Sequence, residues 1–271
     1  MAFMGITRGV PRNVARSPAG AVTGFGGAVN VIHMATAFQM WALTPMSGQS
    51  FTFSMWINNE QTSGTQTRFW STAVTAGAPN DGSSNRQRAE RAATTDDLTV
   101  NAWNSVPEVI QRVDSDDAMD VGSMIHVAAA IDCDAQTRQL YINGIESGTS
   151  ITDVDSTADW RDRLYLFSRP SLAIPYIGKM AEFWFDDSFV DLSSGGISKF
   201  YDGPLRPADL GPRGANPTGS IPKIYLGGDM TANTGGAVGA GAGGGWNAPT
   251  GANNGSATGF TVTGTVTNST L

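Results

Sequence analysis

Apolar and polar residues alternate with a period of two in several segments of the chain, which is the pattern of half-buried β-strands. The clearest segments are 51–57, 124–132, 163–167 and 178–185, and residues 29–32 show a weaker form of it. Because one face of each strand is apolar, the segments together predict a shared core. Its expected members are Phe51, Phe53, Met55, Ile125, Val127, Ile131, Leu140, Ile142, Leu164 and Phe183.

The dipeptide Asn143-Gly144 separates two short alternating segments, 139–142 and 145–147. Both residues readily adopt the positive φ angles of a type I′ turn, so the dipeptide predicts a tight β-hairpin. One short helix is expected, from Ser193 or Ser194 to Tyr201. These elements predict an all-β fold, a two-sheet antiparallel jelly-roll sandwich.

The sandwich is expected over residues 22–202, because the flanking segments differ in composition. Residues 1–21 show neither the strand nor the helix period, which predicts an extended N-terminal arm. Residues 203–224 are punctuated by prolines and predict an ordered connection. Residues 225–271 form a Gly/Thr-rich C-terminal segment. Within the sandwich, the polar segment 75–95 predicts a long surface loop.

Composition narrows the class of protein further. Charged residues make up 15% of the 271 positions and glycine occurs 33 times, which disfavours a helix-rich enzyme or a coiled coil. The net charge of −7 repels phosphate backbones and anionic lipids, so we expect no nucleic-acid and no membrane partner. The basic residues Arg86, Arg88 and Arg91 lie among acidic ones and are expected in a solvated loop. Cys133 is expected to be a structural thiol.

Four segments in this order resemble a known pattern: 51–57, 124–132, 138–144 and 178–185. They comprise a core strand with a tryptophan, a strand that opens with histidine and valine-alanine, an asparagine-glycine hairpin, and a late strand after a glycine. Their order and spacing resemble the concanavalin A-like, laminin-G-type jelly roll over about residues 25–202. The resemblance implies that fold, with His126 in a packing and hydrogen-bonding role.

Segments 191–202, 222–228 and 260–264 are similar to the ends of laminin-G-like proteins of tailed bacteriophages. This resemblance implies a non-catalytic virion structural protein: a capsid decoration, fibre or tail component. The expected location is the virion, after synthesis in the host cytoplasm, since residues 1–10 contain no apolar segment of a signal peptide. The alternative is a stand-alone glycan-binding module.

Three residues, Glu182, Trp184 and Asp186, alternate along the last predicted strand, opposite a face expected to hold Ala181 and Phe183. Glucanases of the same superfamily place carboxylates two residues apart on such a strand. Here tryptophan takes the middle position, and Glu182 and Asp186 would lie roughly 13 Å apart at ~3.3 Å per residue. Because glycoside hydrolysis needs ~5–9.5 Å, a β-glucan hydrolase is disfavoured and no catalytic residue is expected.

Glycan binding without cleavage needs an exposed aromatic ring beside carboxylate or amide groups. Two sites offer this combination: Trp184 between Glu182 and Asp186, and Trp160 next to Asp159. A host-surface glycan is therefore a candidate ligand. The alternative at each site is a tryptophan that packs beneath a loop.

Many laminin-G domains use calcium, bound by carboxylates and carbonyls from loops. Candidates here are Asp132, Asp134, Asp153 and Asp155, but they lack the glycine and the closing glutamate of a calcium-binding loop. We therefore expect no metal and no other cofactor.

Residues 235–245 consist of glycine, alanine and one valine. Ordering them would cost roughly 1–2 kcal/mol of backbone entropy per residue, with almost no side-chain burial in return. We therefore expect residues 1–21 and 203–271 to lie against other virion proteins or other copies of the chain, in a symmetric homo-oligomer. Residues 260–267 would supply strand pairing at that contact. The alternative is a tail that folds back onto its own sheet.

Overall fold

The computed structural model of the protein describes residues 30–226, apart from 38, 44–45, 47, 74–84, 107, 155, 170–173, 205 and 212–213, and also residues 261–263 and 267–270. The expected helix appears as a short 3₁₀ helix, η2 (Gly196–Lys199). The strands are β1 (Asn30–Met34), β2 (Gln39–Leu43), β3 (Ser50–Asn59), β4 (Thr67–Ala73), β5 (Asn85–Arg91), β6 (Asp97–Trp103), β7 (Val109–Ala118), β8 (Met124–Asp132), β9 (Thr137–Ile142), β10 (Ile145–Glu146), β11 (Thr149–Asp153), β12 (Arg163–Leu166), β13 (Gly178–Asp186), β14 (Tyr201–Gly203), β15 (Arg206–Pro207), β16 (Ile224–Leu226), β17 (Thr261–Thr263) and β18 (Thr267–Thr270).

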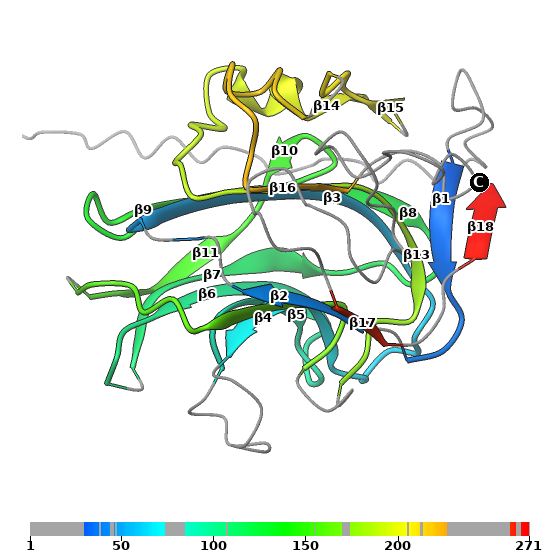
Figure 1. Cartoon of the computed structure of the whole chain (residues 1–271), viewed down its shortest axis with the longest axis horizontal. Coiled ribbons are helices and arrows are strands. Elements are labelled where there is room, and N and C mark those ends of the chain that lie inside the picture. Colours follow the sequence, from blue (N-terminus) through cyan, green and yellow to red (C-terminus); the bar gives the residue numbers. More distant parts are fainter. Residues whose placement is uncertain are drawn as a thin grey trace, which may run out of the picture.

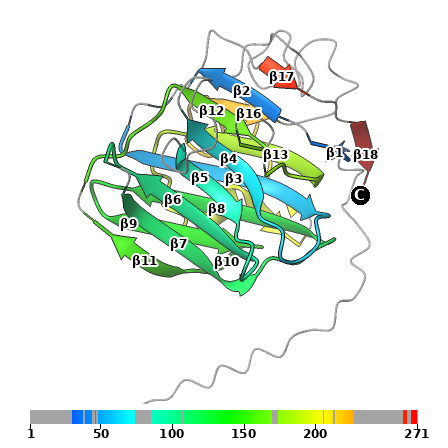
Figure 2. The same cartoon turned by 90° about the horizontal axis from the view of Figure 1, so that it is seen from below.

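Two antiparallel sheets pack face to face, which confirms the expected jelly-roll sandwich (Figure 1). Sheet A has the order β10-β9-β8-β3-β13-β1-β18, and β16 also pairs with β13. Sheet B has the order β11-β7-β6-β5-β4-β12-β2-β17, and its strands lie side by side in Figure 2. A small ribbon of β14 and β15 lies above sheet A.

The core lies between the sheets and is rich in aromatic rings. Phe51, Phe53 and Phe185 from sheet A pack around Trp70 from sheet B, with ring centroids 4.9–5.5 Å from the Trp70 ring. All the core residues expected from the alternation are buried except Ile142, which is half-buried and packs against the same cluster. Period-two alternation thus identified the inner face of sheet A.

The turn at Asn143-Gly144 joins β9 to β10 as expected. Asn143 has φ of 51° and Gly144 has φ of 76°, as a type I′ turn requires. A Cβ atom on Gly144 would lie 2.5 Å from the ring of Tyr201. Glycine is therefore needed here both for its backbone angle and for the close approach of Tyr201.

The outer face of sheet A is covered by the chain between β13 and β16, which we call the cover segment (residues 187–204, 206–211 and 214–223; Figure 1). Its apolar side chains pack on Ala128, Ala130, Tyr141 and Trp184 of the sheet, and they are Val190, Leu192, Phe200 and Leu210. Tyr201 stacks on Trp56 at 5.7 Å between ring centroids. Sheet A is consequently buried on both faces in this region.

His126 lies beneath this cover and is fully buried. Its Nε2 atom is 2.9 Å from the Ser54 Oγ atom, and its ring lies 5.0 Å from the Trp56 ring and 5.4 Å from the Tyr201 ring. Burial lowers the pKa of His126 to about 3. The histidine therefore stays neutral in the folded protein at ordinary pH.

We expect the protein to lose stability as the pH falls from about 6.5 toward 3, because unfolded histidine has a pKa of about 6.5. In this window the unfolded chain binds a proton at His126 that the folded chain does not, so the free energy of unfolding decreases as the pH falls. Urea unfolding at a series of pH values measures the slope. The variant His126→Gln is expected to have a shallower slope than the wild type, and equal slopes would contradict the prediction.

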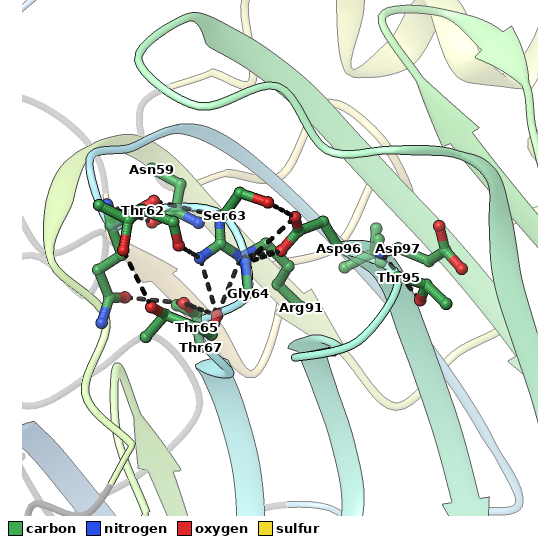
Figure 3. A network of polar contacts seen from close by, with 12 residues as sticks. Asn59, Thr62, Ser63, Gly64, Thr65, Thr67, Arg91, Thr95, Asp96 and Asp97 are labelled. Atoms are coloured by element: carbon green, nitrogen blue, oxygen red, sulfur yellow. Dashed lines mark hydrogen bonds and ion pairs between the residues drawn. The ribbon is translucent and has the colours of Figure 1, made fainter.

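The prediction of a surface loop over residues 75–95 is wrong for Asn85–Arg91, which form β5. Residues 74–84 lie outside the described residues. Arg91 is not solvated but fully buried. Its guanidinium group donates hydrogen bonds of 2.8–3.2 Å to the carbonyl oxygens of Gln61, Thr62 and Thr65, and lies 3.6 Å from Asp96 (Figure 3). This arginine fastens the β3–β4 loop to the β5–β6 turn.

Strands β17 and β18 pair with strands of their own chain. Residues 261–263 pair with β2, and residues 267–270 pair with β1. This is the arrangement of the alternative, a tail that folds back onto its own sheets; the strand pairing between copies expected for residues 260–267 stays a prediction. The N-terminal arm (1–21) and residues 235–245 lie outside the described residues.

Candidate functional site

The expected glycan platform at Trp184 is not exposed. A β-bulge shifts the register of β13: Ala181 pairs with Trp56, whereas Trp184 pairs with Ser54. Glu182 occupies the bulge with φ of 49°. As a result Ala181 faces outward instead of sharing a face with Phe183. Trp184 lies on the outer face as expected, but the cover segment buries its ring there, and its Nε1 atom donates to the Gly214 carbonyl at 2.7 Å.

The two carboxylates of β13 have structural partners. Glu182 accepts a hydrogen bond from the Tyr225 hydroxyl. Asp186 accepts hydrogen bonds from the Ser188 hydroxyl at 2.5 Å and from the Lys223 backbone N–H at 3.1 Å. Asp186 thus holds both ends of the cover segment to the sheet, whereas Glu182 is bound to β16.

Trp160 packs beneath a loop at the edge of the core. Its ring lies 5.5 Å from the Phe51 ring, and its Nε1 atom donates to the Gly48 carbonyl at 2.6 Å. Asp159 pairs with Arg161 at 3.1 Å. The alternative considered for this tryptophan, packing beneath a loop, therefore describes its environment.

A different surface gathers groups of the required kind: the outer face of sheet B (Figure 2). Strands β2, β12, β4, β5, β6 and β7 each direct one residue of a single register row outward, because their neighbours along each strand, such as Leu164, Ala89 and Val100, belong to the core. This row, which we call the polar ladder, consists of Trp41, Tyr165, Ser71, Arg88, Asn101 and Arg112.

A second row runs beside the polar ladder. Arg68 on β4 faces Glu90 on β5, which faces Thr99 on β6 and then Asp114 on β7. Glu90 is the centre of this row: its Oε2 atom is 2.6 Å from Arg68 Nη2, and its Oε1 atom is 3.0 Å from Arg88 Nε. The outer face of sheet B is therefore charged and dense in hydrogen-bonding groups.

Two half-buried tryptophans flank these rows. The Arg163 guanidinium carbon lies 3.9 Å from the centroid of the Trp41 ring, and that of Arg88 lies 5.2 Å from the centroid of the Trp103 ring. Trp41 and Trp103 are four strands apart, which corresponds to roughly 19 Å at ~4.8 Å per strand. The arginines fix the orientation of both rings by stacking on them.

Several polar atoms of this surface are buried and lack a hydrogen-bond partner among the described residues. They include Ser71 Oγ, Asn101 Oδ1 and Trp103 Nε1. An unpaired buried polar atom is costly in free energy, so each such atom in a folded protein calls for a ligand, a water or a nearby partner. Three of them lie within one small area of sheet B.

Sequence reasoning missed this surface because it treated part of β5 as loop. The signal was nonetheless present: Arg88-Ala89-Glu90, Thr99-Val100-Asn101 and Arg163-Leu164-Tyr165 each place one apolar residue between two polar or aromatic ones. Such triplets indicate strands whose outer face is polar. Their mutual register, however, depends on strand pairing between distant segments.

The fold defines the class of protein, an antiparallel two-sheet jelly roll, and a family model identifies it further. Residues 35–188 match the Laminin_G_3 family of the concanavalin A-like lectin/glucanases superfamily. The chain belongs to this family, as the sequence pattern implied. No curated protein sequence matches it.

Solved structures are similar to this chain at low sequence identity. A protein of Bacteroides ovatus, named as a putative carbohydrate binding protein, has a TM-score of 0.57 and 13% identity over 90% of this chain; the match covers 60% of that protein. A SAP-like pentraxin of Limulus polyphemus has a TM-score of 0.45 and 10% identity, over 61% of this chain and 78% of its own. Domains LG4-5 of the mouse laminin alpha1 chain have a TM-score of 0.45 and 14% identity, over 69% of this chain and 48% of that one.

Metal and membrane signatures were sought in the same described ranges. Within them, no three or more His, Cys, Asp or Glu side chains are grouped so that they could hold a metal ion. Likewise, no helix there has the length and apolar character to cross a membrane.

Proposed function

We propose that the domain is a non-catalytic glycan-binding module whose sugar site is the outer face of sheet B. The observation that carries this proposal is the polar ladder, since it aligns aromatic, hydroxyl, amide and guanidinium groups in one register row across six strands. A saccharide offers apolar ring faces and many hydroxyls, and this combination of groups is complementary to both.

The dimensions of the surface suit an oligosaccharide better than a single sugar. Trp41 and Trp103 mark two ends that are roughly 19 Å apart. Among the polar groups of this face, the partly exposed Arg88 and Arg112 can donate to sugar hydroxyls. Tyr165, Ser71 and Asn101 are buried, with 3%, 0% and 1% of their surface exposed, and the Ser71 Oγ and Asn101 Oδ1 atoms have no hydrogen-bond partner among the described residues.

The carboxylates of this face do not form a hydrolytic pair. Glu90 is held by Arg68, Arg88 and Gln66, with the Gln66 Nε2 atom 2.7 Å from Oε2. Asp114 forms a bidentate ion pair with Arg112, at 2.7 and 2.9 Å. Retaining and inverting hydrolysis both need one carboxyl group that donates a proton to the glycosidic oxygen, whereas here both groups serve as counter-ions. This supports binding without cleavage.

Relatives support the class of ligand. The family is part of a superfamily named for lectins and glucanases, and the Bacteroides ovatus protein that shares the fold is named for carbohydrate binding. Fold alone does not specify a ligand, so the residues of the polar ladder remain the basis of the proposal.

A glycan array probed with the full chain tests the proposal. We expect a defined set of glycans to bind, and we expect Trp41→Ala and Trp103→Ala each to weaken the best binder by about tenfold or more, through loss of stacking area. Ile145→Ala, at an exposed position on β10 of the opposite sheet, is the matched control and is expected to bind as the wild type does.

Two outcomes would contradict the proposal. The first is a wild-type protein that binds no glycan, or whose binding survives both tryptophan substitutions. The second is release of reducing sugar from a β-glucan that Glu182→Gln abolishes, since this would make the protein a hydrolase acting at β13.

The resemblance of segments 191–202, 222–228 and 260–264 to phage proteins favours a second, compatible proposal: the module is displayed on a virion, attached to other virion proteins or to copies of itself. A glycan site on sheet B would then serve attachment to the host surface. Mass spectrometry of purified particles tests this proposal, and the absence of the chain from particles would refute it.

A further inference from the structure

The charges on the outer face of sheet B are unbalanced. Arg68, Arg88 and Arg169 interact electrostatically with one another, and we call these three the arginine cluster. Glu90 is the carboxylate that contacts Arg68 and Arg88, and within the described residues no ion pair is found between Arg169 and an acid. One carboxylate therefore contacts two of the three guanidinium groups.

Glu90 already neutralises two of these cations. Its Oε2 atom lies 2.6 Å from Arg68 Nη2 and accepts a hydrogen bond from Gln66 Nε2, and its Oε1 atom lies 3.0 Å from Arg88 Nε. Arg68, which is fully buried, keeps its Nε and Nη1 atoms without any hydrogen-bond acceptor in the described part of the chain. Arg169 Nε is likewise buried and without an acceptor there.

Burial and mutual repulsion act together on these arginines. Desolvation lowers the pKa of Arg68 to about 9, Glu90 opposes this effect, and the neighbouring charges of Arg88 and Arg169 lower the pKa further. The pKa of Arg88 is lowered for the same main reason, its desolvation. Guanidinium groups that are withdrawn from water without enough acceptors bind an anion strongly, because planar N–H pairs match the two oxygens of a carboxylate or a sulfate.

The arginine cluster adjoins the sugar site proposed above. Arg88 is itself a member of the polar ladder, opposite Ser71 and Asn101, and it stacks on Trp103. Arg169 directly follows Ser168, and the Gln39 side chain donates to the Ser168 hydroxyl at 2.7 Å. Arg88 and Arg169 both keep part of their surface exposed, so an anionic group carried by a bound saccharide can reach them, with Arg68 behind.

We infer that this surface selects acidic glycans, and that the arginine cluster binds a carboxylate or sulfate substituent of the sugar. The inference rests on the proposed glycan site and specifies its class of ligand. The net charge of −7 for the whole chain makes a strong long-range attraction for polyanions such as nucleic acid unfavourable. The surface therefore recognises one anionic substituent at one position of a saccharide that it also contacts through its sugar rings.

The test compares charged saccharides with neutral analogues of the same length, using isothermal titration calorimetry on the full chain. Tetragalacturonate and its methyl ester isolate the carboxylate, and a carrageenan tetrasaccharide and its chemically desulfated form isolate the sulfate. We expect the charged member of at least one pair to bind about tenfold or more tightly than the neutral member. The pair with the preference identifies the anion.

Variants assign the preference to the arginine cluster. Arg88→Gln and Arg169→Gln are each expected to reduce the preference to less than about threefold, since each removes one cation. Urea unfolding verifies that each variant is folded, and the second variant keeps the test valid if the first does not fold. Arg206→Gln is the matched control: it removes the same charge from an exposed position on β15, above the opposite sheet, and is expected to keep the preference.

The outcomes separate this inference from the proposed function. Equal affinity for the charged and neutral members of both pairs, with binding that still depends on Trp41 and Trp103, overturns the acidic-glycan inference alone. A preference that persists in both folded arginine variants also overturns it. Absence of binding to every saccharide, on the array and in calorimetry, overturns the proposed function and this inference with it.

Discussion

Replacing Trp184 with alanine is expected to lower the free energy of unfolding by about 3–5 kcal/mol, as for other fully buried tryptophans. The ring lies between sheet A and the cover segment, with its centroid 5.0 Å from that of Phe200. Its loss would open a cavity there and leave the Gly214 carbonyl without its N–H donor. Equilibrium unfolding in urea measures the effect.

The conservative variant Trp184→Phe separates packing from hydrogen bonding. It keeps an aromatic ring but removes the indole N–H, so the expected loss is about 1–3 kcal/mol, the cost of an unpaired buried carbonyl. A small effect of Trp184→Ala, below about 1 kcal/mol, is the signature of a surface side chain. That result would contradict the packing of the cover segment and restore Trp184 as a candidate glycan platform.

Replacing Glu90 with glutamine is expected to lower the free energy of unfolding by about 3–5 kcal/mol, the usual cost of removing one partner from a buried ion pair. Glu90 is the counter-ion of Arg68, which is fully buried, and of Arg88, of which 17% of the side chain is exposed. Without it, the three cations of the arginine cluster would face one another uncompensated. Urea is the suitable denaturant, because it adds no ions that screen these charges.

Asp114→Asn provides a matched control on β7, two strands away in the same sheet. The Arg112–Asp114 pair has a distance of 2.7 Å, close to the 2.6 Å between Arg68 and Glu90, but 37% of the Arg112 side chain is exposed. Solvent therefore screens this pair, and the expected loss is at most about 1 kcal/mol. Equal losses for the two variants would show that burial does not strengthen the role of Glu90.

The sequence was sufficient to predict the parts of the fold in which alternation is regular. β3 and β8 pair over their whole length without a register shift, so every second residue faces the core as expected. The Asn143-Gly144 turn carries its own backbone preference, which does not depend on the rest of the fold. Local signals of this kind are readable without knowledge of distant contacts.

The candidate site at Trp184 was wrong because the cover segment buries it: alternation placed Trp184 on the face opposite Phe183, and the structure keeps it there. The bulge in β13 explains a different error. Alternation assumes that successive residues point to opposite faces, whereas Glu182 adopts a left-handed backbone conformation and inserts an extra residue. Ala181, on the N-terminal side of the bulge, therefore faces outward instead of sharing a face with Phe183. The sequence also gives no direct sign of the cover segment, because residues 187–223 lack a regular period and bury only scattered apolar side chains.

The outer face of sheet B was missed for a different reason. Residues 85–91 are rich in charge, and charged segments between strands are usually loops. Their charges are satisfied across strands instead: Glu90 pairs with Arg68 of β4, and Arg91 binds carbonyl groups of the β3–β4 loop. Cross-strand compensation cannot be inferred from a single segment.

The terminal strands place a constraint on the order in which the protein is made and folded. β1 and β2 are synthesised early, yet their outer edges are completed by β18 and β17, from the other end of the described chain. Contacts this distant in sequence close late and slowly. During translation both sheets therefore keep an open edge, on which a second nascent chain could add a strand, until residues 261–270 have left the ribosome.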